Sequence, residues 1–278
     1  MDSIGSVLLH LDASPRCEQR LEAAGRLAGA HQAELKVIYS VVPGTLQIQF
    51  AEGVSAELLQ RIRPSDDQRR ARARSTFDKA VAGGLRNATW LEPIEDLSLR
   101  DFSRQALYAD LLVLGQREPG ADGAGGVPSD FVESVLIDSG KPALVIPYIG
   151  AQATLGQTVM VAWKETRETA RALTSSLPLL KKAKRVHLAS WGDEQSIEHQ
   201  RMPALAAYLR RHGVEPTLHH YGDEPGSIGE YMLSAAADLN ADVLVMGAYG
   251  HSRAREWVLG GATRTILESM TIPVLMSH

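Results

Sequence analysis

The chain contains ten short apolar runs, and most of the stretches between them carry helical patterns. Each run is rich in Val, Ile or Leu and is bounded by polar residues, Gly or Pro. Continuous apolar runs of this kind are typical of strands that are buried on both faces of a parallel sheet. The runs span residues 6–11, 34–39, 88–92, 110–115 and 143–148 in the first half and 158–163, 185–190, 216–220, 242–247 and 273–278 in the second.

Helices are expected between these strands because apolar residues recur there every three or four positions. One such stripe contains Cys17, Leu21, Ala24, Leu27 and Ala28, and another contains Ala170, Leu173, Leu177 and Leu180. Strands that alternate with helices form parallel sheets with right-handed crossovers. The predicted fold is therefore α/β, with two tandem flavodoxin-like domains, each a doubly wound, five-stranded parallel sheet.

The two halves repeat one another in sequence. The stretch "LYADLLVLG" in the first half corresponds to "LNADVLVMG" in the second, and "SGKPALVIP" corresponds to "MTIPVLMS". A chain of 278 residues is also long enough for two domains of ordinary size. We place the domains at residues 1–149 and 155–278, on either side of "YIGAQATLG".

Composition excludes several classes of partner. The net charge is −4, so a basic surface that would neutralise nucleic-acid phosphates is not expected. The single cysteine, Cys17, cannot form an intrachain disulfide, which suits a reducing cytoplasm. No apolar run approaches the ~18 residues that a membrane span needs, and no signal peptide is recognisable at the N-terminus. A cytoplasmic protein is expected.

A glycine-rich segment follows the fourth strand of the second half. Gly247 ends that strand, and Gly250, Gly260 and Gly261 lead into a helical pattern. Free N–H groups at a helix N-terminus attract phosphate, and glycine lets the backbone approach a ligand closely. In a doubly wound sheet the ligand lies at the carboxyl ends of the strands where the strand order reverses, here the first and fourth. The spacing is that of neither a P-loop nor a Rossmann fingerprint.

This segment resembles the universal stress protein family, whose nucleotide-binding members carry Gly-x2-Gly, nine residues, and then Gly followed by Ser, Thr or Asn. The resemblance extends over both halves, so the chain is similar to a tandem member of the family. It implies contacts of a bound adenine nucleotide with the first strand end, the second strand end and the glycine segment. The implied residues are Ala162, Trp163, Lys164, Ser190, Met246, Gly247, Gly250, His251, Ser252, Arg253, Gly260, Gly261, Ala262 and Thr263.

The second half departs from the family pattern at two positions. Lys164 stands where the family usually has an aspartate, and Gly261 stands where a hydroxyl residue is expected. The first half keeps the aspartate as Asp12, but Glu118 replaces the second glycine. Asp130 also lies at the expected start of the following helix, where it competes with an anion. We interpret the first half as a degenerate copy of the nucleotide site.

Other conspicuous residues have simpler interpretations. Residues 61–74 carry six arginines and two aspartates, which indicates a solvated helix face more than a binding patch. His219 and His220 are adjacent on a strand, so they point to opposite faces and cannot chelate one metal ion together. Cys17 lies on an apolar stripe, as a buried thiol does. The default role of Trp163, Trp191 and Trp257 is core packing.

Three functions follow from this pattern. The first is a stress-response regulator that binds ATP or a related adenine nucleotide, with or without Mg²⁺, and has at most slow hydrolytic activity. The second is a scaffold that works without nucleotide, since relatives pair through their last strands and an intrachain pseudo-dimer follows from two copies in one chain. The third is a weak ATPase or nucleotidyl-transfer enzyme. No catalytic residues and no metal ligands stand out, and the protein partners and any homodimer stay open.

Overall fold

A computed structural model describes residues 3–12, 14–42, 56–92, 98–118, 126–150, 154–222, 226–248 and 261–278. For residues 56–63, 98–100 and 197–198 it describes the backbone only. Contacts divide the chain into a first unit, Ile4–Ser139, and a second unit that contains Gly140–His278. Within these ranges no helix is long and apolar enough to cross a membrane.

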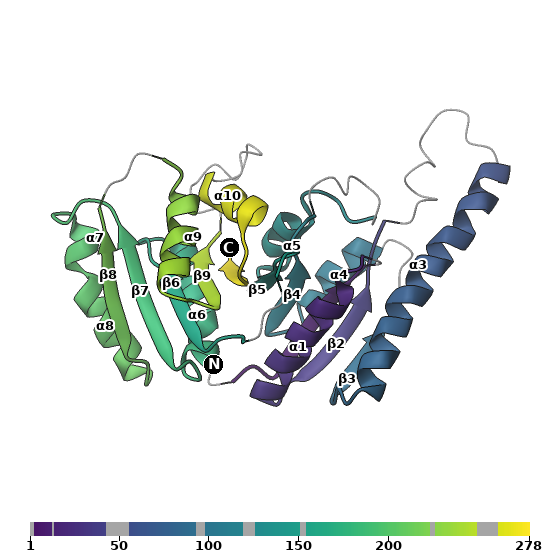
Figure 1. The fold of residues 1–278 in the computed structure, drawn as a ribbon, viewed down its shortest axis with the longest axis horizontal. Coiled ribbons are helices and arrows are strands. Elements are labelled where there is room, and N and C mark those ends of the chain that lie inside the picture. Colours follow the sequence, from purple (N-terminus) through teal and green to yellow (C-terminus); the bar gives the residue numbers. More distant parts are fainter. Residues whose placement is uncertain are drawn as a thin grey trace. The chain divides into compact units, whose positions relative to one another are not determined.

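The first unit contains parallel strands in the order β3-β2-β1-β4. Helices α1 and α3 contact each other, and α4 contacts α5 (Figure 1). The strands are β1 (Ser6–Leu11), β2 (Glu34–Tyr39), β3 (Ala88–Leu91) and β4 (Leu111–Gly115). The helices are α1 (Cys17–His31), α3 (Ala56–Ala82), α4 (Ser98–Ala106) and α5 (Phe131–Ser139).

The second unit contains strands in the order β5-β10-β9-β6-β7-β8. The strands are β5 (Ala143–Ile146), β6 (Thr158–Ala162), β7 (Arg185–Trp191), β8 (Pro216–Tyr221), β9 (Val243–Gly247) and β10 (Val274–Ser277). The helices are α6 (Arg167–Leu180), α7 (Ile197–Gln200), α8 (Met202–Arg211), α9 (Ile228–Asp238) and α10 (Gly261–Ser269). The strand order reverses between β6 and β9, which confirms the predicted doubly wound α/β fold.

The last strand of the first half, β5, belongs to the second unit by its contacts. It pairs with β10 in antiparallel register, with Leu144 opposite Leu275, whereas every other strand pair within the second unit is parallel among the described residues. This is the pairing of last strands that the family resemblance implies. The division by contacts therefore falls before β5, while the repeat boundary at residues 149–155 stays a prediction.

The helices bury the faces that the sequence pattern predicts, with one exception. In α1, Cys17, Leu21, Ala24, Leu27 and Ala28 are all buried. In α6 the buried set includes Leu173, Leu177 and Leu180, but Ala170 is exposed, so its predicted place in the stripe was wrong. The buried stripe instead runs through Thr169, Ala172 and Ser176, because two small polar side chains complete the helical period that the apolar residues alone suggested.

The start of α6 packs tightly against the end of β9. A Cβ atom added at Gly247 would lie 2.5 Å from the backbone nitrogen of Thr169 and 2.8 Å from the carbonyl carbon of Glu168. The helix begins at this place because the Thr166 hydroxyl accepts a hydrogen bond of 3.2 Å from the Thr169 N–H. Glycine at position 247 is therefore required by helix packing.

A buried polar network lies at the end of β1 in the first unit. Arg20 of α1 forms an ion pair of 3.1 Å with Asp12, and the Cys17 thiol donates to the same carboxylate at 3.0 Å. Although burial opposes it, the Arg20 guanidinium holds the pKa of Asp12 well below its usual range. Cys17 is buried, as predicted, and this burial raises its pKa to about 12, which favours the protonated thiol.

His10 adjoins this network and is also buried. Its Nε2 lies 2.6 Å from the Ser40 carbonyl oxygen, and its ring contacts Phe102 and Phe131 with centroids 5.3 and 4.3 Å away. Burial, reinforced by the Arg20 charge, lowers the pKa of His10 to about 4. His10 is therefore a neutral core residue at pH 7.

We predict that Gly247→Ala destabilises the second unit by about 1–3 kcal/mol, because the new methyl group overlaps backbone atoms that cannot move independently. Gly261→Ala is the matched control, since a Cβ at Gly261 would meet none of the described atoms within 4 Å. Because alanine is the better helix former, the control variant should be as stable as the wild type or slightly more stable. Urea unfolding measures both variants, and equal midpoints for the two would contradict the packing argument.

We also predict a loss of stability in acid that depends on His10. The folded state takes up this proton only near pH 4, whereas an unfolded histidine takes it up near pH 6.5, so stability is full above pH 6.5 and falls as the pH decreases toward 4. The slope is about 1.4 kcal/mol per pH unit, or roughly 3 kcal/mol in total. His10→Gln should remove this component from urea titrations at pH 7.5, 6.5, 5.5 and 4.5. His212→Gln, just after the end of α8, serves as the control, and an unchanged slope in His10→Gln would refute the assignment.

Candidate functional site

The candidate site lies at the carboxyl ends of β6, β7 and β9. These ends are adjacent because Val161 pairs with Val245 and Ala162 pairs with Ala189 in parallel register. The side chains of Ala162 and Met246 are buried in the core. These two residues therefore offer a ligand only their backbone.

Two residues follow directly after β6. The Trp163 N–H donates to the Ala189 carbonyl oxygen at 2.8 Å, so its amide extends the ladder to β7 and its ring is half-buried. Lys164 is exposed, and its carbonyl oxygen accepts a hydrogen bond of 2.7 Å from the Thr166 N–H in the turn before α6. Lys164 is thus a cationic side chain at the strand end where the strand order reverses.

Ser190 lies near the end of β7 and is buried. Its hydroxyl lies 3.1 Å from Nδ1 of His220 on β8, and the His220 ring contacts the His199 ring of α7 with centroids 3.9 Å apart. His219 points to the other face, as predicted, where its Nε2 lies 2.9 Å from Nδ1 of His187. Sequence reasoning missed the Ser190–His220–His199 contact, because nothing in the spacing of these residues brings them together.

The glycine segment is described only at its two ends. Gly247 ends β9, and Gly261 begins α10 as an exposed residue, followed by Ala262 and the buried Thr263. The remaining predicted contacts of this segment, Gly250, His251, Ser252, Arg253 and Gly260, lie outside the described residues. In the described ranges no three His, Cys, Asp or Glu side chains gather closely enough to hold a metal ion.

The corresponding strand ends of the first unit are filled by the chain's own side chains. A Cβ added at Gly115, the end of β4, would lie 2.5 Å from the guanidinium carbon of Arg20. Gly126, with φ of +71°, accepts a hydrogen bond of 2.6 Å from the Val42 N–H, and Val127 packs against Tyr39 and Val41. In this unit, Asp12 is paired with Arg20. Gly126 and Val127, which correspond to the end of the glycine segment, contact residues at the end of β2 and just after it.

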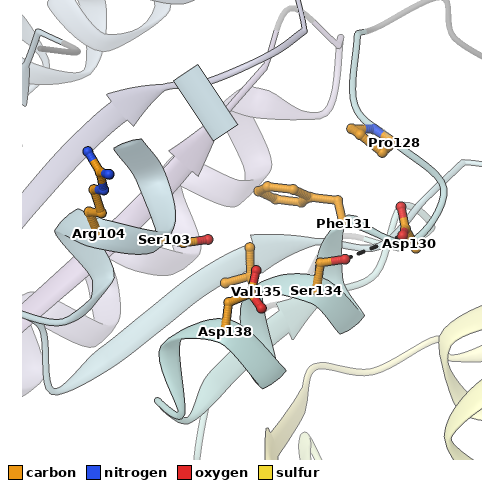
Figure 2. Close-up of a pocket in the computed structure, with 8 residues that line it drawn as sticks. All are labelled: Ser103, Arg104, Pro128, Asp130, Phe131, Ser134, Val135 and Asp138. Atoms are coloured by element: carbon orange, nitrogen blue, oxygen red, sulfur yellow. Dashed lines mark hydrogen bonds between the residues drawn. The ribbon is translucent and has the colours of Figure 1, made fainter. Parts of the chain in front are cut away.

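A hollow of about 340 Å³ lies elsewhere in the first unit, between α4 and α5. Figure 2 shows Phe131 and Val135 of α5 lying opposite Ser103 of α4, with Asp130 and Asp138 at either end of the α5 side. It is therefore separate from the predicted nucleotide contacts, which all belong to the second unit.

Comparison with known proteins agrees with this architecture. The model of the "Universal stress protein family" matches residues 156–278. A curated universal stress protein from Synechocystis sp. is 25% identical over 300 residues, covering 97% of this chain and 98% of the relative.

Two solved structures share the fold along nearly the whole chain. A universal stress protein from Archaeoglobus fulgidus has a TM-score of 0.74 at 18% identity, covering 99% of this chain and 96% of that one. A functionally unknown protein from Pseudomonas aeruginosa has a TM-score of 0.62 at 16% identity, covering 99% and 93%. The second half of the chain therefore matches the universal stress protein family, and the whole chain is similar in sequence to a universal stress protein and shares the fold of these solved structures.

Proposed function

We propose that the second unit binds ATP or a related adenine nucleotide at the carboxyl ends of β6 and β9, and that the protein acts as a stress-response regulator. The observation that carries this proposal is the position of the glycine segment. It begins at Gly247, beside β6, the first strand of the second repeat, at the point where the strand order reverses. Crevices at such points are the usual ligand sites of doubly wound sheets.

The charges of the described residues support a phosphate ligand. Lys164 is an exposed cation directly after β6, and Gly261 begins a helix whose first N–H groups carry partial positive charge. A Cβ at Gly261 would meet no described atom within 4 Å, so no side chain of the described residues blocks this helix start. Together these groups supply positive charge that can stabilise a bound phosphate.

We assign the nucleotide to the second unit alone. In the first unit Arg20 lies against Gly115 and pairs with Asp12, so both the space and the charge are already taken. The expected stoichiometry is one nucleotide per chain. The first unit then acts as a structural partner of the nucleotide-binding unit.

Binding, rather than turnover, is the proposed role of the nucleotide. Efficient phosphoryl transfer needs metal-holding carboxylates and a residue that orients the nucleophile. The described strand ends of the second unit supply a lysine and a serine bonded to a histidine, and no clustered carboxylates. We expect ATP hydrolysis slower than about one turnover per minute, far below typical enzyme rates.

The first prediction of this proposed function concerns Lys164. Lys164→Ala should weaken ATP binding roughly three- to tenfold, and AMP binding less, because the lost cation pairs with outer phosphates. Isothermal titration calorimetry with ATP, ADP and AMP, with and without Mg²⁺, measures this. Lys184→Ala is the matched control, since Lys184 precedes β7 at the opposite ends of the strands. Absence of heat with all three nucleotides would instead support a nucleotide-independent scaffold.

The second prediction concerns Gly261, where an added side chain would meet no described atom within 4 Å. Gly261→Asp should weaken ATP binding by at least about tenfold, because a carboxylate at the helix start satisfies the N–H groups and repels phosphate. Gly261→Ser supplies an uncharged hydroxyl at the same place and should bind as tightly as the wild type or more tightly. If the two variants bind ATP equally, α10 does not contact the phosphates.

A further inference from the structure

The hollow between α4 and α5 has the size of a small-molecule site, at about 340 Å³. One face of α5 lines it, with Phe131, Ser134, Val135 and Asp138, and Asp130 directly before the helix continues the same face. Phe131 and Val135 are buried and form an apolar floor. The groove therefore combines an apolar centre with a carboxylate toward each end.

Neither carboxylate has a cationic partner among the described residues. Asp130 lies 3.4 Å from the Ser134 hydroxyl, and Asp138 forms no hydrogen bond or ion pair there. Asp138 also occupies the last turn of α5, which contains no basic residue. Because the carbonyl end of a helix already carries partial negative charge, a cation beside Asp138 would be stabilised by both.

The α4 wall of the groove does not neutralise the carboxylates of Asp130 and Asp138. Arg104 of α4 borders the groove and is exposed, and Figure 2 shows its guanidinium extending away from Asp138. Ser103, the other residue of that wall, is neutral and points toward α5 (Figure 2). The α5 side of the groove is therefore anionic, and it favours a cationic ligand.

The separation of the two carboxylates defines the length of such a ligand. The Ser134 N–H donates to the Asp130 carbonyl oxygen at 2.9 Å, so Asp130 already has helical spacing relative to α5. At about 1.5 Å of rise per residue, the backbones of Asp130 and Asp138 lie about 12 Å apart. A linear chain of methylene groups that joins terminal ammonium groups would cover Phe131 and Val135 while its ends reach the carboxylates.

We propose that the groove between α4 and α5 binds a linear aliphatic polyamine, with one ammonium group at Asp130, another at Asp138 and the methylene chain over Phe131 and Val135. The site lies in the first unit and shares no residue with the nucleotide contacts of the second unit. The test of this proposal is therefore independent of nucleotide binding.

The test is calorimetric titration of the full chain with spermidine at fixed ionic strength, with putrescine as a shorter diamine. We expect saturable binding of one spermidine per chain and weaker binding of putrescine, which is too short to reach both carboxylates. Asp130→Asn and Asp138→Asn should each weaken spermidine binding roughly three- to tenfold. Glu133→Gln is the matched control, because it removes the same charge from α5 at a residue that does not line the groove.

Two results would overturn the proposal. One is the absence of saturable spermidine binding. The other is an equal loss of affinity in Glu133→Gln and Asp138→Asn, which would indicate general attraction to an acidic helix. Amide chemical shifts of the wild-type protein give a measurement that does not depend on variant stability. Spermidine should move the resonances of α4 and α5, and shifts spread over the whole chain would count against the site.

Discussion

The parallel ladder between β6 and β9 is the constraint on which the second unit depends. These strands are the first and fourth of the second sequence repeat, and Val161 lies opposite Val245. Because crossovers are right-handed, helices that follow strands on either side of this ladder leave on opposite faces of the sheet. The carboxyl ends of the two strands therefore lack a covering crossover, and a ligand can reach the backbone there.

The two units use corresponding positions in opposite ways. After β1 stands Asp12, which is buried and neutralised by Arg20, and a Cβ at Gly115 would collide with the same arginine. After β6 stands Lys164, which is exposed to solvent. Burial of a charge is costly unless it is paired, so the first unit stabilises its own aspartate from within. The second unit keeps an accessible cation that can pair with a ligand.

Much of the fold could be predicted from the sequence, because strands buried on both faces leave an unmistakable apolar pattern. Strand β1 spans the predicted residues 6–11, and β9 begins one residue later than its predicted run. The error at Ala170 had a physical cause, since small polar residues such as Ser176 can fill a buried stripe as well as alanine. A small polar side chain can be buried in a helix when its hydroxyl donates to the helix backbone. The Ser176 hydroxyl donates to the Leu173 carbonyl oxygen at 2.8 Å in this way.

The sequence by itself determined the alternation of strands and helices, the repeat and the glycine segment after β9, because each of these is carried by neighbouring residues. Only the tertiary structure decided which polar groups meet. The contact of Ser190 with His220 joins residues on two strands. The Arg20 side chain of α1 fills the space beside Gly115, at the end of the distant strand β4. Such contacts depend on strand register and helix packing, which bring side chains from distant parts of the chain within a few ångströms, and no local pattern of residues encodes them.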